Sequence, residues 1–295
     1  MNLSFKNFSI RIIGYLPYII FFYVIYTIEI FRELLLYNGL LQLMLFLIVA
    51  CIPAYLTKRM SYVDIAWPWG LVLIGVLALL LGDGYKPRIF LISGMYLFSG
   101  LRMGIGALIL FKKGHLDSEL SRYTYQRRRW EKAGYKNLDI SLQYEIMIQC
   151  FANITFLALP AILMAQNTAT SLSVIEIIGA SLWAFWFVLE HVSDMQKQQF
   201  LKKSFLEKKK KQVCNAGFWK YSRHPNYFAE WMVWNSMILS AFFSYITFYS
   251  QGKLFVWGAV FIALLYISYI MYTTLVYYTG AVPSEYYTLQ KRPNY

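Results

Sequence analysis

The chain of 295 residues is 58% hydrophobic and 19% aromatic, and only 15% of its residues are charged. Soluble domains carry about a quarter charged residues, so this composition excludes an ordinary soluble protein. It indicates one integral domain in a membrane, without a separate soluble module. The three cysteines, Cys51, Cys150 and Cys214, lie far from one another and from any histidine at metal-ligand spacing. Neither a disulfide framework nor a metal site is therefore predicted.

Long apolar segments recur along the whole chain. A membrane-spanning helix needs about 20 mostly apolar residues. Eight such segments are present, at about 12–28, 39–56, 62–81, 89–111, 144–166, 172–193, 228–248 and 254–279. The sequence thus predicts an all-α fold, a polytopic membrane helical bundle of about eight transmembrane helices.

The positive charges are distributed unevenly between the two sides that these spans define. Most of the 28 Lys and Arg residues lie near the termini or in the loops 112–143 and 194–227. The positive-inside rule then places both termini and both large loops in the cytoplasm, in a bacterial inner membrane or the endoplasmic reticulum. The net charge of +13 is explained by this topology, so we expect membrane lipids as partners and no nucleic acid.

The first of the two loops contains "SRYTYQRRRW", in which arginines alternate with aromatic residues. Guanidinium groups such as those of Arg122 and Arg127 bind phosphates bidentately, and neighbouring aromatic rings can stack on a purine. The same residues would also adhere to anionic lipid headgroups. From this loop alone, a phosphorylated cofactor and a lipid surface are both open.

Two charged residues fall inside predicted spans. Asp64 lies near the start of the third span, and Arg102 lies in the middle of the fourth. A charge at mid-depth costs on the order of 3 kcal/mol, so a partner or a polar cavity is expected. The two spans are consecutive and antiparallel, so Asp64 and Arg102 are candidates to pair with each other. That pair would be either functional or purely structural.

Acceptor groups line the end of the sixth span. Glu190, Asp194 and Gln198 follow one another at intervals of four residues and share one helical face. Three acceptors on one stripe after an apolar span predict the wall of a polar cleft.

The stretch "GFWKYSRHPNYFAEW", residues 217–231, concentrates polar groups at the start of the seventh span. Proline is favoured at the first position of a helix, so Pro225 predicts a helix that begins there. The positive end of that helix, with Arg223 and His224 just before it, forms an anion site.

The same stretch carries acceptors one turn deeper. Asn226 and Glu230 are four residues apart and share a face, and Tyr227 is a neighbour of Glu230. Donors at the mouth and acceptors below them suit a ligand with a phosphate at one end and a hydrogen-bonding ring at the other. The alternative is an interfacial turn whose aromatic residues belong to the membrane belt.

These motifs resemble those of the steroid 5α-reductase and sterol-reductase superfamily, in its branch with a 5α-reductase-like C-terminal domain. The resemblance rests on residues 217–231 and on "DIAW", "SRYTYQRRRW", "LEHVSDMQKQQF" and the terminal "KRPNY", in this order along the chain. It covers residues 61–295, which we expect to form a reductase-like transmembrane domain with a C-terminal cofactor site. Residues 1–60 form N-terminal transmembrane helices without such a match.

The resemblance implies an NADPH-dependent oxidoreductase that reduces a carbon–carbon double bond, conjugated to a ketone, in a steroid-like or other lipid. The cofactor-binding residues that it implies are Arg122, Arg127, Glu190, Asp194, Gln198, Arg223, His224, Asn226, Tyr227 and Glu230. Glu190 and Asp194 would contact the nicotinamide-ribose half of NADPH. Asn226 and Glu230 would bind the carboxamide or ribose, and Arg223, His224 and Tyr227 the phosphate and ring.

The catalytic residues expected from the same resemblance are Asp64, Tyr227 and Glu230, with Asp64 or a buried tyrosine as the proton donor. Two other functions remain open. Membrane methyltransferases of the isoprenylcysteine carboxyl and phospholipid type share the Arg-His-Pro-x-Tyr core and would use S-adenosylmethionine. A lipid-binding protein without catalytic activity could use the same scaffold.

Overall fold

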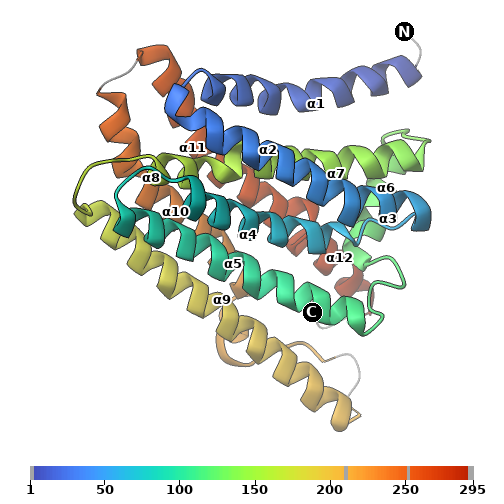
Figure 1. Ribbon diagram of the computed structural model, residues 1–295. Helices are drawn as coiled ribbons and strands as arrows, with labels where there is room; N and C mark the ends of the chain where they lie inside the picture. The colour runs from blue at the N-terminus through green and yellow to red at the C-terminus, as the bar shows by residue number, and fades with distance from the viewer. Residues whose placement is uncertain (1–2, 209–211, 251–252, 292–295) are drawn as a thin grey trace.

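A computed structural model describes residues 3–208, 212–250 and 253–291 of the chain (Figure 1). The terminal "KRPNY" motif therefore lies, apart from Lys291, outside the described residues. The described residues form helices and no strands. The elements are α1 (Leu3–Tyr26), η1 (Glu29–Phe31), α2 (Arg32–Phe46), η2 (Leu47–Cys51), α3 (Ile52–Thr57), α4 (Val63–Leu81), α5 (Lys86–Lys112), α6 (Ser121–Lys132), α7 (Leu138–Ile154), η3 (Phe156–Ala158), α8 (Leu159–Ala165), α9 (Val174–Leu206), η4 (Gly217–Lys220), α10 (Pro225–Tyr249), α11 (Leu254–Thr273), η5 (Thr274–Tyr278) and α12 (Ala281–Lys291).

Each of the eight predicted spans lies in this helical bundle, so the predicted fold class is confirmed. Six helical segments of the described chain are long and apolar enough to cross a membrane: Glu29–Thr57, Val63–Leu81, Lys86–Lys112, Leu138–Ala165, Val174–Leu206 and Leu254–Gln290. The apolar part of α1, Ile10–Tyr26, is shorter. Helix α10, which buries Ser236, Ser240 and Ser244, is not among these segments. By the length and composition of these six segments, the chain is an integral membrane protein.

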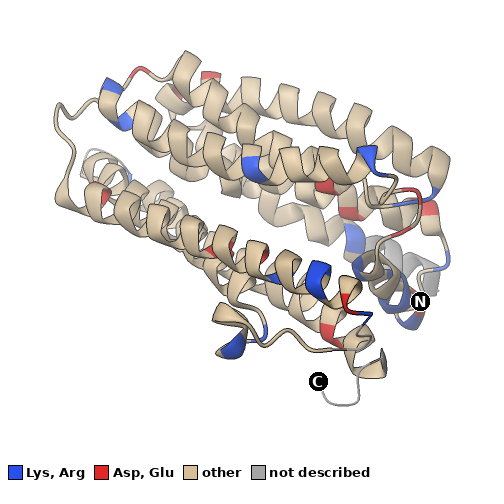
Figure 2. Ribbon diagram, turned by 90° about the horizontal axis from the view of Figure 1, so that it is seen from below, with Lys and Arg blue, Asp and Glu red and all other residues tan. Residues whose placement is uncertain are grey.

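The two ends of the bundle differ in their charge. Helices α6 and α12, the ends of α3 and α5 and the far end of α9 gather at one end (Figure 1). Figure 2 shows most of the charged residues at that same end. The loops that were predicted to face one side of the membrane are thus on one side of the bundle.

Helix α9 is longer than the sequence predicted. A capping box between Ser173 and Glu176 starts it, and it runs for 33 residues, to Leu206. A helix of this length spans about 50 Å, whereas the apolar core of a bilayer is about 30 Å thick. The predicted span of about 172–193 therefore covers only the first part of a longer helix, and Glu190, Asp194 and Gln198 all lie on that helix.

The span of α7 and α8 is broken where its backbone leaves the α-helical conformation at Thr155, with φ −112° and ψ −88°. The side-chain amide of Asn38 on α2 donates to the carbonyls of Asn153 and Ile154, each at 3.1 Å. Irregular backbone at membrane depth is tolerated only where the protein itself satisfies its polar groups. Asn38 does so here.

An ion pair joins two helices at the other end of the bundle. Arg88 on α5 and Glu176 on α9 have fully buried side chains and bond to each other. Arg88 also donates to the carbonyls of Asn167, at 3.0 Å, and Ala169, at 2.7 Å. A single guanidinium thereby fixes the loop between α8 and α9.

We predict that Arg88→Met destabilises the protein by about 3–5 kcal/mol, because Glu176 would be left as a buried charge without its cation. The combined variant Arg88→Met with Glu176→Leu should regain most of that loss. Thermal unfolding of the detergent-purified protein measures both effects. Lys253→Met, at an exposed lysine of the same end, is the control. Equal midpoints for Arg88→Met and this control would contradict a structural role for the pair.

Candidate functional site

The turn before α10 is fixed against α9. Gly217 has φ +56°, a conformation that other residues rarely adopt, and a Cβ on it would lie 2.2 Å from the Gln196 side chain, so a larger residue would be strained and would displace Gln196. The backbone N–H of Phe218 donates to Gln196 Oε1 at 2.9 Å. The indole of Trp219 donates to the Ser193 carbonyl at 2.8 Å. The turn thus sets where α10 begins relative to the acceptor stripe of α9.

Helix α10 begins at Pro225, as the sequence predicted, with His224 at its N-cap position. Pro225 is buried, so the first turn of the helix enters the bundle directly. Asn226 and Glu230 then share one face of α10, and this face meets α9.

Arg102 is the centre of the polar contacts between α5, α9 and α10. Its guanidinium bonds to Glu190 and, at 3.0 Å, to Asp194 Oδ2. The other oxygen of Asp194 accepts a hydrogen bond from Asn226 Nδ2, also at 3.0 Å. Three helices therefore meet through one arginine, and the expected pair of Asp64 with Arg102 does not form. The reason is that Arg102 faces α9 instead of α4.

Asp64 is bound by α6. Its two oxygens accept hydrogen bonds from Arg122 and from the hydroxyl of Tyr123. Burial would lower the pKa of Arg122, but the Asp64 carboxylate raises it above the ordinary value, so the arginine stays charged. Burial, and then the charge of Asp64, raise the pKa of the Tyr123 hydroxyl well above its usual value. The α6 helix, which was predicted as a basic loop, is thus bound to the start of α4.

Tyr227 and Glu230 lie between these two groups. The charges of Arg102, Asp194 and Arg122 act on the Glu230 carboxyl. The Tyr227 hydroxyl experiences the charges of Arg122, Glu230, Asp194 and Asp64. Together they form what we call the polar cluster: Asp64, Arg102, Arg122, Tyr123, Glu190, Asp194, Asn226, Tyr227 and Glu230.

Some polar atoms of the cluster have no hydrogen-bond partner in the described part of the chain. Asn226 Oδ1 and the Nε atoms of Arg102 and Arg122 are buried and make no hydrogen bond to a described residue. Since buried polar groups in proteins are almost always paired, these unpaired atoms make the cluster a candidate site for a polar ligand.

The C-terminal helix α12 holds the start of α10. His224 Nε2 lies 3.0 Å from Glu285 Oε1, and Arg223 Nη1 lies 3.8 Å from the same oxygen. The His224 ring stacks on Tyr227, with centroids 5.3 Å apart. The side chain of Arg223 is 60% exposed, which suits a residue at the entrance to the polar cluster rather than one in a buried contact. Glu285 was not predicted as a site residue.

Two predicted residues lie outside the polar cluster. Gln198 is exposed on α9, one turn beyond Asp194. Arg127 bonds to Glu119 at 2.7 Å and to the Lys58 carbonyl, so it anchors α6 to the end of α3. In the described residues, no group of three or more His, Cys, Asp or Glu side chains could hold a metal ion.

Residues 46–292 match the model of a protein family of unknown function, DUF1295. The chain belongs to this family. No curated protein and no solved structure gives a significant match. The DUF1295 region contains the whole polar cluster and Glu285, so every residue that forms the candidate site lies within the part of the chain that defines the family.

The environment of His224 makes a prediction about its titration. Burial lowers its pKa from the ordinary 6.5, while the hydrogen bond and charge of Glu285 partly raise it again. We therefore expect a pKa below 6.5 in the native protein and a still lower value in Glu285→Gln. NMR of histidine-labelled protein measures both, with His224→Asn used to assign the signal. A pKa that rises in Glu285→Gln would contradict the contact between α10 and α12.

Proposed function

We propose that the protein is an NADPH-dependent reductase of a carbon–carbon double bond in a lipid, of the steroid 5α-reductase and sterol-reductase type. The observation that carries this proposal is the set of contacts around Arg102. Glu190 and Asp194 bind its guanidinium, and Asn226 bonds to Asp194. Tyr227 and Glu230 lie beside them. The resemblance of the motifs assigned all of these side chains except Arg102 to a single cofactor site, although Glu190 and Glu230 are 40 residues apart in the sequence.

The chemistry of the cluster fits the cofactor. The unpaired Asn226 Oδ1 would accept a hydrogen bond from the nicotinamide carboxamide, and the Glu230 carboxylate would accept one from the carboxamide or ribose. Arg223 and His224, at the positive end of α10, would bind a phosphate. NADPH, when bound, supplies the hydride. Glu190 and Asp194 are engaged by Arg102, so their part is to orient Asn226 and α10.

The geometry separates the candidates for the proton donor. Both oxygens of Asp64 accept hydrogen bonds, from Arg122 and Tyr123, so Asp64 holds α6 in place. The Tyr227 hydroxyl has no hydrogen-bond partner in the described chain and is surrounded by the charged groups of the cluster. In this proposal Tyr227 donates a hydrogen bond to the substrate carbonyl oxygen, which polarises the conjugated double bond for hydride addition at the β-carbon.

The cofactor is tested by ligand-dependent stability. We predict that NADPH at a hundred times its dissociation constant stabilises the detergent-purified protein by about 2.7 kcal/mol. Asn226→Ala should lose most of this stabilisation, and Asn215→Ala, at an exposed asparagine upstream, should keep it. Stabilisation by S-adenosylmethionine instead would favour the methyltransferase. If neither ligand stabilises the protein, the remaining candidate is a lipid-binding protein without catalytic activity.

The proton donor is tested with a steroid enone and NADPH. We predict that Tyr227→Phe lowers kcat about 10²- to 10⁴-fold while NADPH still stabilises the protein. Tyr221→Phe, at a tyrosine that is 84% exposed just before α10, should turn over normally. If Tyr227→Phe turns over at the wild-type rate and Asp64→Asn does not, the role belongs to Asp64.

A further inference from the structure

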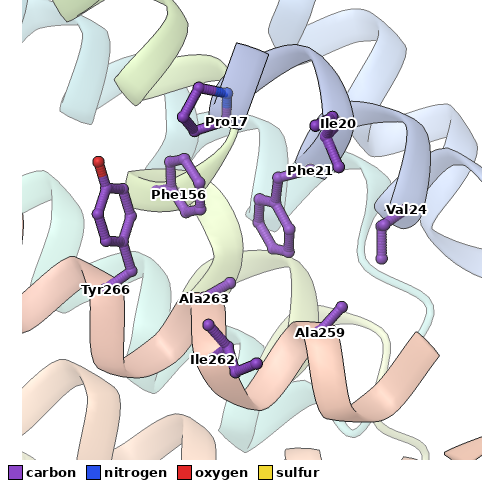
Figure 3. A pocket seen from close by; sticks show the side chains of 9 residues that line it. All are labelled: Pro17, Ile20, Phe21, Val24, Phe156, Ala259, Ile262, Ala263 and Tyr266. Atoms are coloured by element: carbon purple, nitrogen blue, oxygen red, sulfur yellow. The ribbon is translucent and has the colours of Figure 1, made fainter. Parts of the chain in front are cut away.

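A ligand that carries a phosphate needs positively charged hydrogen-bond donors. The residues that line the pocket between α1, η3 and α11 carry no charge (Figure 3). The start of α10, by contrast, has Arg223 and His224 just before Pro225, at the positive end of the helix. The proposed function assigns the phosphate of the cofactor to these two side chains. An anion of the protein itself already binds them.

That anion is the carboxylate of Glu285 on α12. It accepts a hydrogen bond from His224 Nε2 at 3.0 Å, and Arg223 Nη1 lies 3.8 Å from the same oxygen. Carboxylate and phosphate oxygens bind the same donors, so a phosphate on Arg223 and His224 would take the position of Glu285 Oε1. Two anions at one position repel each other, so only one of them can stay. The Glu285 side chain is 29% exposed, so its contact lies at the surface, where it can open without uncovering the core.

Helix α12 is also fastened to α6, which lies at the same end of the bundle (Figure 1). Arg128 Nη1 donates to the hydroxyl of Tyr286, the residue after Glu285, at 2.6 Å. The ring of Tyr286 lies 5.1 Å from that of Tyr125 on α6. Adjacent residues of α12 therefore bind α10 and α6, and the contact with α6 keeps Glu285 in place against the start of α10.

A close turn before α12 sets the position of this helix. A Cβ on Gly280 would collide with the backbone carbonyl oxygen of Leu275 and would lie 3.1 Å from the ring of Tyr227. Because a backbone atom cannot move aside as the end of a flexible side chain can, glycine is needed at this position. The chain thus turns from η5 into α12 directly beside the first turn of α10.

We propose that Glu285 is a built-in competitor for the phosphate of the ligand, and that α12 is the strap that holds it on Arg223 and His224. Glu285 binds these two donors until a phosphate displaces it. The apparent dissociation constant of the ligand is then the intrinsic one divided by the fraction of molecules in which Glu285 has left the donors. This inference rests on the proposed function, because that function assigns the phosphate to Arg223 and His224.

The test is isothermal titration calorimetry of the full-length, detergent-purified protein with inorganic pyrophosphate and, separately, with NADPH. At pH 8 His224 is neutral in every variant, because its pKa lies below 6.5. We expect Glu285→Gln to bind each probe about three- to tenfold more tightly than the wild type, between the effects of an exposed ion pair and of a hydrogen bond to a charged group. Glu131→Gln removes the same charge from an exposed position on α6 and should change binding by less than about twofold.

The strap is tested through Tyr286. Tyr286→Phe removes the hydrogen bond to Arg128 but keeps the ring, so it should tighten the binding of pyrophosphate about two- to threefold. In the Glu285→Gln background it should add nothing, because no carboxylate remains for the strap to hold. Tyr269→Phe, at a tyrosine on α11 that is 61% exposed, is the matched control. Thermal unfolding checks that each variant is folded. A further gain in the double variant would contradict the strap.

The two probes separate this proposal from the proposed function. Pyrophosphate decides the competition: equal or weaker binding to Glu285→Gln than to the wild type would overturn it, and so would no binding to either protein. NADPH decides the reductase. If pyrophosphate binds more tightly to Glu285→Gln and NADPH binds to neither protein, the competition stands and the reductase is wrong.

Discussion

The arrangement of the candidate site depends on one guanidinium group. Arg102 lies in the middle of α5, in a stretch that is otherwise without charged residues, and a charge in that position is tolerated only with anionic partners. Glu190 and Asp194 provide them, and the side chains of Arg102 and Glu190 are 16% and 6% exposed. Because Asp194 then uses its second oxygen for Asn226, the same arginine also sets the rotation of the first turn of α10. Removing this cation would leave two carboxylates, one of them buried, and would release three helices at once.

A second arginine, Arg88, also has an anionic partner inside the bundle, but all of its surroundings are protein. Arg88 and Glu176 are fully buried at the other end of the bundle, and the guanidinium uses its remaining donors on backbone carbonyls. No room is left there for a ligand. At Arg102, by contrast, the Nε atom stays unpaired and so does Asn226 Oδ1. The two ion pairs join the same helices, α5 and α9, but only that of Arg102 belongs to the candidate site.

The local patterns of the sequence were sufficient for the long apolar helices and for the start of α10, but not for the polar helix α6. Hydropathy marks segments that cross a membrane, and Pro225 marks a helix start, since both signals arise from neighbouring residues. The partners of the charged residues could not be predicted in the same way. Asp194 is 92 residues from Arg102, and Glu285 is 61 residues from His224. Hydropathy reports which residues avoid water, but not which faces of two helices meet. The expected pairing of Asp64 with Arg102 failed for this reason.

The identity of the hydrogen-bond partners then separates residues that the sequence grouped together. Arg122 and Arg127 lie five residues apart in one basic motif, and both were assigned to a phosphorylated cofactor. Arg127 is engaged by Glu119 and a backbone carbonyl at the end of α3, whereas Arg122 joins the polar cluster through Asp64. The same criterion distinguishes the tyrosines: the Tyr123 hydroxyl is bonded to Asp64, while that of Tyr227 has no hydrogen-bond partner in the described chain. In a membrane protein the cost of an unpaired polar group is high, so the places where such groups gather are those where a ligand has the most to contribute. The polar cluster is such a place.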